Sequence, residues 1–197
     1  MTTPSKKRVG FALCGSFCTL RSFVSDIRTL VDAGYEVTPI MSETVYETST
    51  RFGDATEFIR EVETVTGKKI LHTRTDVEPI GPKQLLDLLL IAPCTGNTLA
   101  KIASGISDSS VSLAAKAHLR NERPVLIALS TNDALSGNAK NLGVLLNTKH
   151  VYFVPLRQDD PKKKPSSLVA VRSLILPAVE AALEERQIQP LFMQPSE

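Results

Sequence analysis

The sequence predicts an α/β fold: a single doubly wound, mostly parallel sheet with helices on both faces. Three observations support this prediction. Short β-rich runs alternate with amphipathic stretches, as they do when a helix follows each strand of a parallel sheet. The runs are apolar without alternation, which is typical of strands buried on both faces. The chain has 197 residues, enough for one domain of this kind and few for two.

Six short apolar runs are predicted to be strands. In chain order they are residues 9–13, 37–41, 69–73, 86–92, 124–129 and 150–155. The run at 86–92 is expected to be the central strand, and the run at 69–73 a short one. This succession is typical of a Rossmann or flavodoxin-like sheet.

Six amphipathic stretches are predicted to be helices, because their apolar residues recur at gaps of three and four. In chain order they are residues 20–31, 54–66, 98–104, 110–119, 141–148 and 168–186. Gly34 and Gly67 follow the first two, where a glycine ends a helix. Asp54 is expected to cap the second, with Glu57 as its capping-box partner. Pro177 should kink the last helix or mark a first turn.

No internal repeat or linker divides the chain. We therefore predict one domain over residues 1–197, with its core at about 7–187 and a flexible tail at 188–197. Residues 157–167 are charged and contain two prolines, which predicts a solvated loop.

The composition argues against several classes of partner. Lys and Arg number 23 and Asp and Glu 21, so the net charge of +2 gives no reason to expect nucleic-acid binding. No apolar run is long enough for a signal-peptide core or a membrane span. Three cysteines and the lack of an N-glycosylation sequon favour a reduced compartment. We expect a cytoplasmic protein with neither nucleic acid nor membrane as partner.

Small polar residues cluster where four of the predicted strands end. Ligands of open α/β sheets bind beyond the carboxyl ends of the strands, so these residues are the candidates for cofactor binding. They are Gly15, Ser16, Ser42, Thr44, Pro93, Cys94, Thr95, Gly96, Asn97, Ser130, Thr131 and Asn132. Their hydroxyl, amide and backbone N–H groups predict a neutral hydrogen-bonding pocket.

The loop after the first strand favours a phosphate monoester. Residues 10–15 fit G-x-x-x-x-G but lack the lysine of a triphosphate-binding loop, and no G-x-G-x-x-G is present. Backbone N–H groups at a helix start attract an anion, to which Ser16 and Thr19 would add hydroxyl donors. The alternative is that Ser16 is only a helix cap and Gly15 only a tight turn.

The cysteines and histidines predict no metal or nucleophilic site. Cys14, Cys18 and Cys94 are interpreted as small apolar fillers. The three histidines are isolated in the sequence, too few for a zinc site with the cysteines at these spacings. His118, near a predicted helix end, is interpreted as a surface residue.

Residues 91–108 carry the most specific pattern, Ile-Ala-Pro-Cys-Thr-Gly-Asn-Thr-Leu-Ala-Lys-Ile-Ala-Ser-Gly-Ile-Ser-Asp. The segment resembles the Ala-Pro-x-Thr-x-Asn-Thr-x-Ala-Lys-x-Ala-x-Gly-Ile-x-Asp signature of FMN-binding flavoproteins, which include the phosphopantothenoylcysteine and lantibiotic-peptide cysteine decarboxylases. The resemblance implies FMN as cofactor, with Gly15, Ser16 and Ser42 at its phosphate. It also implies that Asn97 holds the flavin edge or a substrate carboxylate.

Two departures from that family argue against decarboxylation. The family's catalytic histidine lies about a dozen residues before Ile-Ala-Pro, whereas residues 78–83 here contain no histidine. Of the family's Pro-x-Met-Asn segment only Asn132 persists, behind Ser130 and Thr131. A changed reaction, or none, is expected.

From about Lys7 to Pro190 the chain resembles one branch of the family, the B subunits of bacterial dipicolinate synthases. The resemblance is carried by residues 49–53, 78–83, 114–117, 130–135 and 151–155. It implies a homo-oligomer that acts with an NAD(P)-dependent A subunit. Together they would oxidise a dihydrodipicolinate-level dicarboxylate to dipicolinate in the mother cell during sporulation. The alternatives are a non-catalytic assembly subunit and an FMN-dependent cysteine decarboxylase.

A dicarboxylate substrate calls for cations near the pocket. Arg51, Lys83 and Lys101 lie nearest in the sequence, and an arginine can bind a carboxylate through two hydrogen bonds. Asn97, Arg51 and Lys83 are therefore the candidate catalytic residues, although each charge could equally be a solvated surface group. Asp108 is expected to cap the next helix or to fix a subunit contact.

Overall fold

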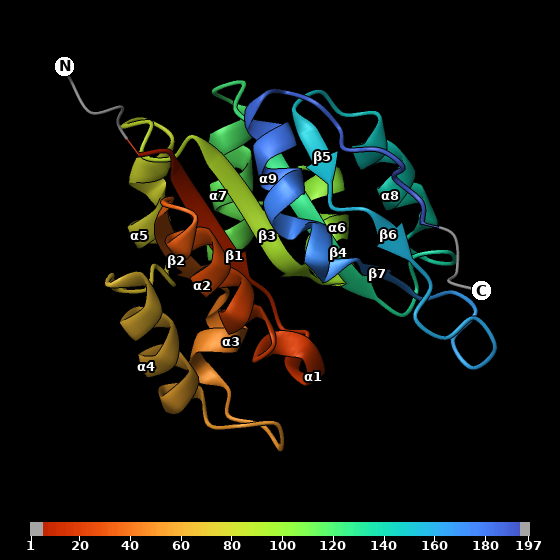
Figure 1. Cartoon of the computed structure of the whole chain (residues 1–197), viewed down its shortest axis with the longest axis horizontal. Coiled ribbons are helices and arrows are strands. Elements are labelled where there is room, and N and C mark those ends of the chain that lie inside the picture. Colours follow the sequence, from red (N-terminus) through yellow and green to blue (C-terminus); the bar gives the residue numbers. More distant parts are fainter. Residues whose placement is uncertain (1–5, 194–197) are drawn as a thin grey trace.

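Seven strands form one sheet through the centre of the molecule (Figure 1). The computed structural model describes residues 6–193. The strands are β1 (Arg8–Leu13), β2 (Glu36–Met41), β3 (Leu88–Cys94), β4 (Val125–Thr131), β5 (Val151–Phe153), β6 (Leu156–Arg157) and β7 (Leu168–Ala170). The first five are parallel in the order β2-β1-β3-β4-β5, and β7 and β6 continue antiparallel from the carboxyl end of β4. The predicted flavodoxin-like fold class is confirmed.

Helices cover both faces of the sheet. They are α1 (Phe17–Leu20), α2 (Phe23–Asp32), α3 (Glu43–Glu47), α4 (Ala55–Thr66), α5 (Arg74–Val77), η1 (Glu78–Ile80), α6 (Gly96–Ala103), α7 (Ser110–Leu119), α8 (Ala139–Leu146), η2 (Arg172–Leu174) and α9 (Ile175–Leu183). Helices α2, α4 and α9 pack on one face, and α5 to α8 on the other.

The central strand β3 shows why its sequence is a continuous apolar run. All seven of its residues are buried. Leu88 and Leu90 join the core cluster under α2 and α9, whereas Leu89 and Ile91 join the cluster under α6 and α7. Side chains alternate across a strand, so a strand covered on both faces needs apolar residues at every position.

The predicted helix ends are confirmed at three positions and wrong at one. Asp54 caps α4 by accepting hydrogen bonds from two backbone N–H groups, and Gly67 ends this helix with φ +65°. Gly34, after α2, has φ +91°. Glu57 does not complete a capping box: its carboxylate binds Arg21 at 3.1 Å instead.

Several predicted boundaries differ from the structure because short-range patterns do not show tertiary pairing. The expected helix 20–31 is divided into α1 and α2, and α3 was not predicted. The expected strand 69–73 shrinks to one bridge between Ile40 and Leu71.

The chain after residue 150 differs most from the prediction. The expected helix 168–186 begins as β7, and Pro177 lies in the first turn of α9, as one of the two alternatives predicted. Part of the expected flexible tail is paired with β6: the N–H of Leu156 donates to Leu191 and that of Met193 to Leu156. Residues 194–197 lie outside the described part of the chain. No helix within residues 6–193 is long and apolar enough to cross a bilayer.

Candidate functional site

The loops that follow β1, β2 and β3 meet at one edge of the sheet. The chain leaves β1 toward β2 and then crosses back to β3, so this edge contains the topological switch point where ligands of such sheets bind. Two backbone hydrogen bonds connect the loops. The N–H of Cys14 donates to the carbonyl of Pro93 (3.2 Å), and that of Ser42 donates to Leu13 (3.0 Å).

These loops surround a hollow of about 320 Å³, here called the first hollow. Its lining comprises Cys14, Gly15, Ser42, Glu43, Thr44, Thr95, Asn97, Thr98, Lys101 and Ser109. Five of the predicted cofactor-binding residues are among them: Gly15, Ser42, Thr44, Thr95 and Asn97. Thr98 and Ser109 were not predicted, although Thr98 lies one helical turn after Thr95 and Ser109 directly precedes the predicted helix 110–119.

Helix α6 presents its N-terminus to the first hollow. Thr95 caps the helix, its Oγ1 accepting from the N–H of Thr98 (3.3 Å). The hydroxyl of Thr98 in turn donates to Cys14 Sγ (3.3 Å), which ties the helix to the end of β1. The first N–H groups of a helix have no intrahelical acceptor and favour an anion. The Asn97 carboxamide is exposed and has no hydrogen-bond partner within residues 6–193, so it is free to bind a ligand.

Gly96 allows the loop after β4 to pack against this helix start. A Cβ atom on Gly96 would lie 2.6 Å from both Thr131 Oγ1 and Asn138 Nδ2. Asp133 holds these two groups, accepting from Thr131 at 2.6 Å and from Asn138 at 2.7 Å. Thr131 therefore packs against the start of α6 and lines neither hollow. Asn132 is exposed and also lines neither hollow.

Two charged side chains, Glu43 and Lys101, line the first hollow, and each has a partner in the protein. Glu43 accepts a hydrogen bond from the N–H of Ser110 at 2.9 Å, at the start of α7. Lys101 binds Asp108 at 2.8 Å. The expectation that Asp108 caps the next helix is wrong, because Ser109 is the cap of α7 and forms a capping box with Ser112.

Ser16 connects the first hollow to a second one. Its hydroxyl lies 3.0 Å from Thr19 Oγ1 and 3.3 Å from Ser130 Oγ. Thr19 and Ser130 belong to the second hollow, of about 490 Å³, between the β1–α2 segment and strands β4, β6 and β7. Its lining comprises Thr19, Phe23, Leu129, Ser130, Arg157, Asp159, Val169, Ala170, Val171, Arg172 and Ser173.

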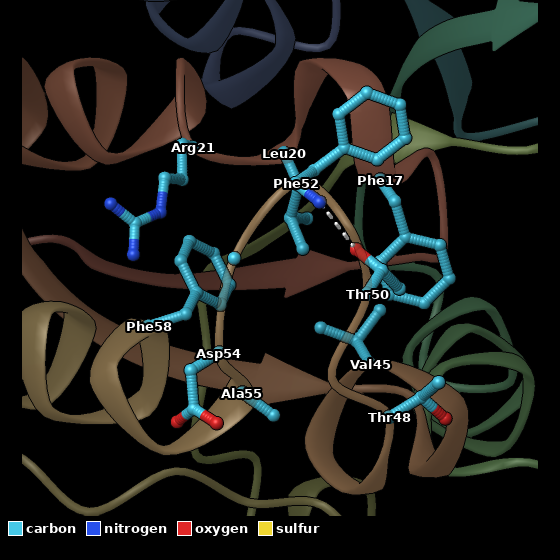
Figure 2. A pocket seen from close by; sticks show the side chains of 11 residues that line it. Phe17, Leu20, Arg21, Val45, Thr48, Thr50, Phe52, Asp54, Ala55 and Phe58 are labelled. Carbon is cyan, nitrogen blue, oxygen red and sulfur yellow. Dashed lines mark hydrogen bonds between the residues drawn. The ribbon is translucent and has the colours of Figure 1, made fainter.

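Both predicted catalytic cations, Arg51 and Lys83, lie outside both hollows. Arg51 is on the α3–α4 loop, where its guanidinium stacks 4.8 Å from the centre of the Phe52 ring. Figure 2 shows this loop around a small cavity of about 20 Å³ with largely apolar walls, including Phe17 and Phe58. Lys83 is exposed in the segment before β3, at the amino ends of the parallel strands and away from the first hollow. Residues 78–83, which correspond in sequence to the segment that carries the family's histidine, also lie at the amino ends of the strands.

Two further predicted cofactor-binding residues, Pro93 and Cys94, line neither hollow. Pro93 and Cys94 are buried in β3, and burial raises the pKa of the Cys94 thiol well above its usual value. Burial also raises the pKa of Cys14, to about 11. Cys14 and Cys94 are buried, as expected of small fillers, although Cys14 also accepts the hydrogen bond of Thr98. The same interpretation is wrong for Cys18, which is exposed. Within residues 6–193 no group of three or more potential ligand side chains is arranged to hold a metal ion.

The prediction that His118 is a surface residue is wrong. His118 lies in the last turn of α7 and is 1% exposed. Burial, reinforced by the positive charge of Arg123, lowers the pKa of His118 to about 4. The imidazole is therefore neutral and structural, and it lies outside both hollows.

The fold and the switch-point hollow define a class of protein that the sequence comparisons identify. The profile of the Flavoprotein family matches residues 1–176, and the chain belongs to this family. It is 44% identical to the B subunit of dipicolinate synthase of Bacillus subtilis (strain 168), over 98% of this chain and 97% of that protein. The predicted resemblance is confirmed.

Structural comparison agrees with the sequence relationship. The crystal structure of the dipicolinate synthase B subunit from Bacillus halodurans C has a TM-score of 0.89 and 42% identity, covering 98% of this chain and 99% of that one. The FMN-dependent cysteine decarboxylase SpaF, 22% identical, has a TM-score of 0.62 over 91% of this chain and 97% of its own. At that identity the likeness shows a shared fold.

Proposed function

We propose that this chain is an FMN-binding component of dipicolinate synthase. It acts with an NAD(P)-dependent A subunit to oxidise a dihydrodipicolinate-level precursor to dipicolinate during sporulation. The observation that carries the proposal is the first hollow, in which the Gly15 turn, the cap of α3 and the N-terminus of α6 face one another. The similarity along the whole chain to the B subunit of dipicolinate synthase supports the choice of reaction.

The donor chemistry of the first hollow fits a phosphate monoester. Ser42, Thr44 and Thr95 bring hydroxyls, and the start of α6 brings backbone N–H groups and the positive end of the helix dipole. The one carboxylate in the lining, that of Glu43, already accepts hydrogen bonds from Ser110. We propose that Gly15, Ser16, Ser42, Thr44 and Thr95 bind the flavin phosphate.

Forming dipicolinate from a dihydropyridine dicarboxylate removes two electrons and two protons. Bound FMN would supply the two-electron acceptor. The chain's own residues bind and orient: Asn97, with two donor hydrogens and one acceptor, would hold the flavin edge or a substrate carboxylate. Arg51 and Lys83 lie outside the hollows of their own copy, so a catalytic role for either requires a neighbouring copy in a homo-oligomer.

Titration of the purified protein with FMN tests the cofactor. We expect Ser42→Ala and Thr44→Val each to weaken binding about tenfold, the loss of one charge-assisted hydrogen bond. Thr64→Val, on the exposed face of α4, is the matched control and should bind like the wild type. Equal affinity of all four proteins, or no binding to any of them, would contradict the proposed site.

Reconstitution with the A subunit tests the reaction. The mixture should form dipicolinate faster than the A subunit alone, and Asn97→Ala should reduce that rate, because its carboxamide would orient a ligand. An unchanged rate with Asn97→Ala in a stable complex would favour a non-catalytic assembly role. Carbon dioxide release from a cysteine substrate would favour the decarboxylase alternative.

A further inference from the structure

The second hollow has the composition of a site for a flat anionic molecule. Its lining includes the apolar side chains of Phe23, Leu129 and Val169 and the hydroxyls of Thr19 and Ser130. Its volume of about 490 Å³ lies within the usual range of small-molecule pockets. The hydroxyl of Ser16 bonds both Thr19 and Ser130, so this hollow adjoins the proposed phosphate site.

Strand pairing places an arginine over this hollow. Val169 of β7 is paired with Ser130 of β4 on one side and with Arg157 of β6 on the other. Directly paired residues point to the same face of a sheet, so these three side chains form one row, and all three residues line the hollow. Two strand spacings separate the Cα atoms of Ser130 and Arg157 by about 10 Å.

The three charged residues that line the second hollow, Arg157, Asp159 and Arg172, differ in their partners. Arg172 binds Asp26 at 2.8 Å and stacks 5.1 Å from the centre of the Phe23 ring. Asp159 binds Lys164 at 3.0 Å. Within residues 6–193, by contrast, no carboxylate lies within 4 Å of the Arg157 guanidinium. A guanidinium in this position offers two parallel N–H donors to an incoming carboxylate.

We propose that Arg157 anchors a carboxylate of the substrate in the second hollow, with the ring of the substrate against the apolar side chains of Phe23 and Leu129. The inference rests on the proposed function for the identity of the substrate, a planar pyridine-type dicarboxylate. It adds a binding residue outside the α6 segment, on an edge hairpin that the sequence did not predict. In this arrangement the Ser16 turn separates the phosphate of the cofactor from the substrate.

Binding of dipicolinate, the reaction product, tests the inference by isothermal titration calorimetry on the full chain. Arg157→Gln should weaken binding about tenfold or more, because it removes a charge-assisted pair. Arg157→Lys should give an intermediate affinity, since it keeps the charge and loses the planar fork. Arg60→Gln is the matched control, an exposed arginine on α4, which packs beside β2 at the other side of the sheet from β6 and β7 (Figure 1). It should bind dipicolinate like the wild type.

The same four proteins are titrated with FMN to separate the two proposals. Normal FMN affinity with weakened dipicolinate binding in Arg157→Gln supports the inference. Equal dipicolinate affinity of Arg157→Gln and Arg60→Gln, or no dipicolinate binding by the wild type, overturns it. Absence of FMN binding contradicts the proposed function alone, because the dipicolinate comparison is made without FMN. Unchanged melting temperatures establish that the variants are folded.

Discussion

Replacing Gly96 by alanine places a methyl group where the structure has no room for one. The added Cβ would lie 2.6 Å from Thr131 Oγ1 and from Asn138 Nδ2, and 2.8 Å from Asp133 Oδ1. These three groups are hydrogen-bonded to one another at 2.6 and 2.7 Å, so none can move without breaking that network. Overpacking of this kind costs about 1–3 kcal/mol. The better helix propensity of alanine offsets up to about 1 kcal/mol of it.

With an overpacking cost of about 2 kcal/mol, the middle of that range, the net effect is a loss of about 1–2 kcal/mol in the free energy of unfolding. For a chain of this length the melting temperature should fall by about 2–8 °C. Thermal unfolding followed by far-ultraviolet circular dichroism, together with urea titration, measures both quantities. Gly143→Ala in α8 is the control, because a Cβ there meets nothing within 4 Å. This control should stabilise by about 0.5–1 kcal/mol. A Gly96→Ala protein as stable as the wild type would refute the packing argument.

Two further predictions concern the buried and exposed titratable groups. Because burial lowers the pKa of His118 to about 4, the unfolded chain takes up the proton first as the pH falls from about 6.5. The folded state should lose up to about 3 kcal/mol between pH 6.5 and 4. His118→Leu should flatten that pH dependence, and an unchanged slope in urea titrations would contradict it. Cys18 is exposed whereas Cys14 and Cys94 are buried, so a thiol reagent should modify Cys18 in the native protein and all three only after unfolding. Native modification of Cys14 would be the contrary result.

Sequence reasoning succeeded where a local pattern has one structural solution. The unbroken apolar run of β3 can be satisfied only between two layers of helices, and Asp54 and Gly67 mark the ends of α4 through local backbone chemistry. It failed where the deciding contact is distant in the chain. Leu168 to Ala170 form a strand because β4 and β6 flank them, and His118 is buried because the loop before β3 packs against α7.

The residues of the candidate site likewise include some that local sequence predicts and some that only tertiary contacts place. Residues that follow strand ends, such as Gly15, Ser42 and Asn97, could be found from the sequence, because the carboxyl ends of parallel strands meet at one edge. The prediction for Lys83 relied on its closeness to β3 in the sequence, but Lys83 precedes this strand and therefore lies at its amino end, away from the first hollow. Arg157 could not be found, since only the pairing of β6 with β7 and of β7 with β4 aligns it with Ser130.

By itself, then, the amino-acid order determined the layered α/β architecture, the family and the polar edge of the sheet, because all three follow from periodicity and short motifs. Tertiary structure alone decided which charges are paired, which side chains face a hollow and which glycine has a neighbour too close for a methyl group. Those properties depend on the distances between atoms of residues that are far apart in the chain, and local sequence patterns do not predict such distances.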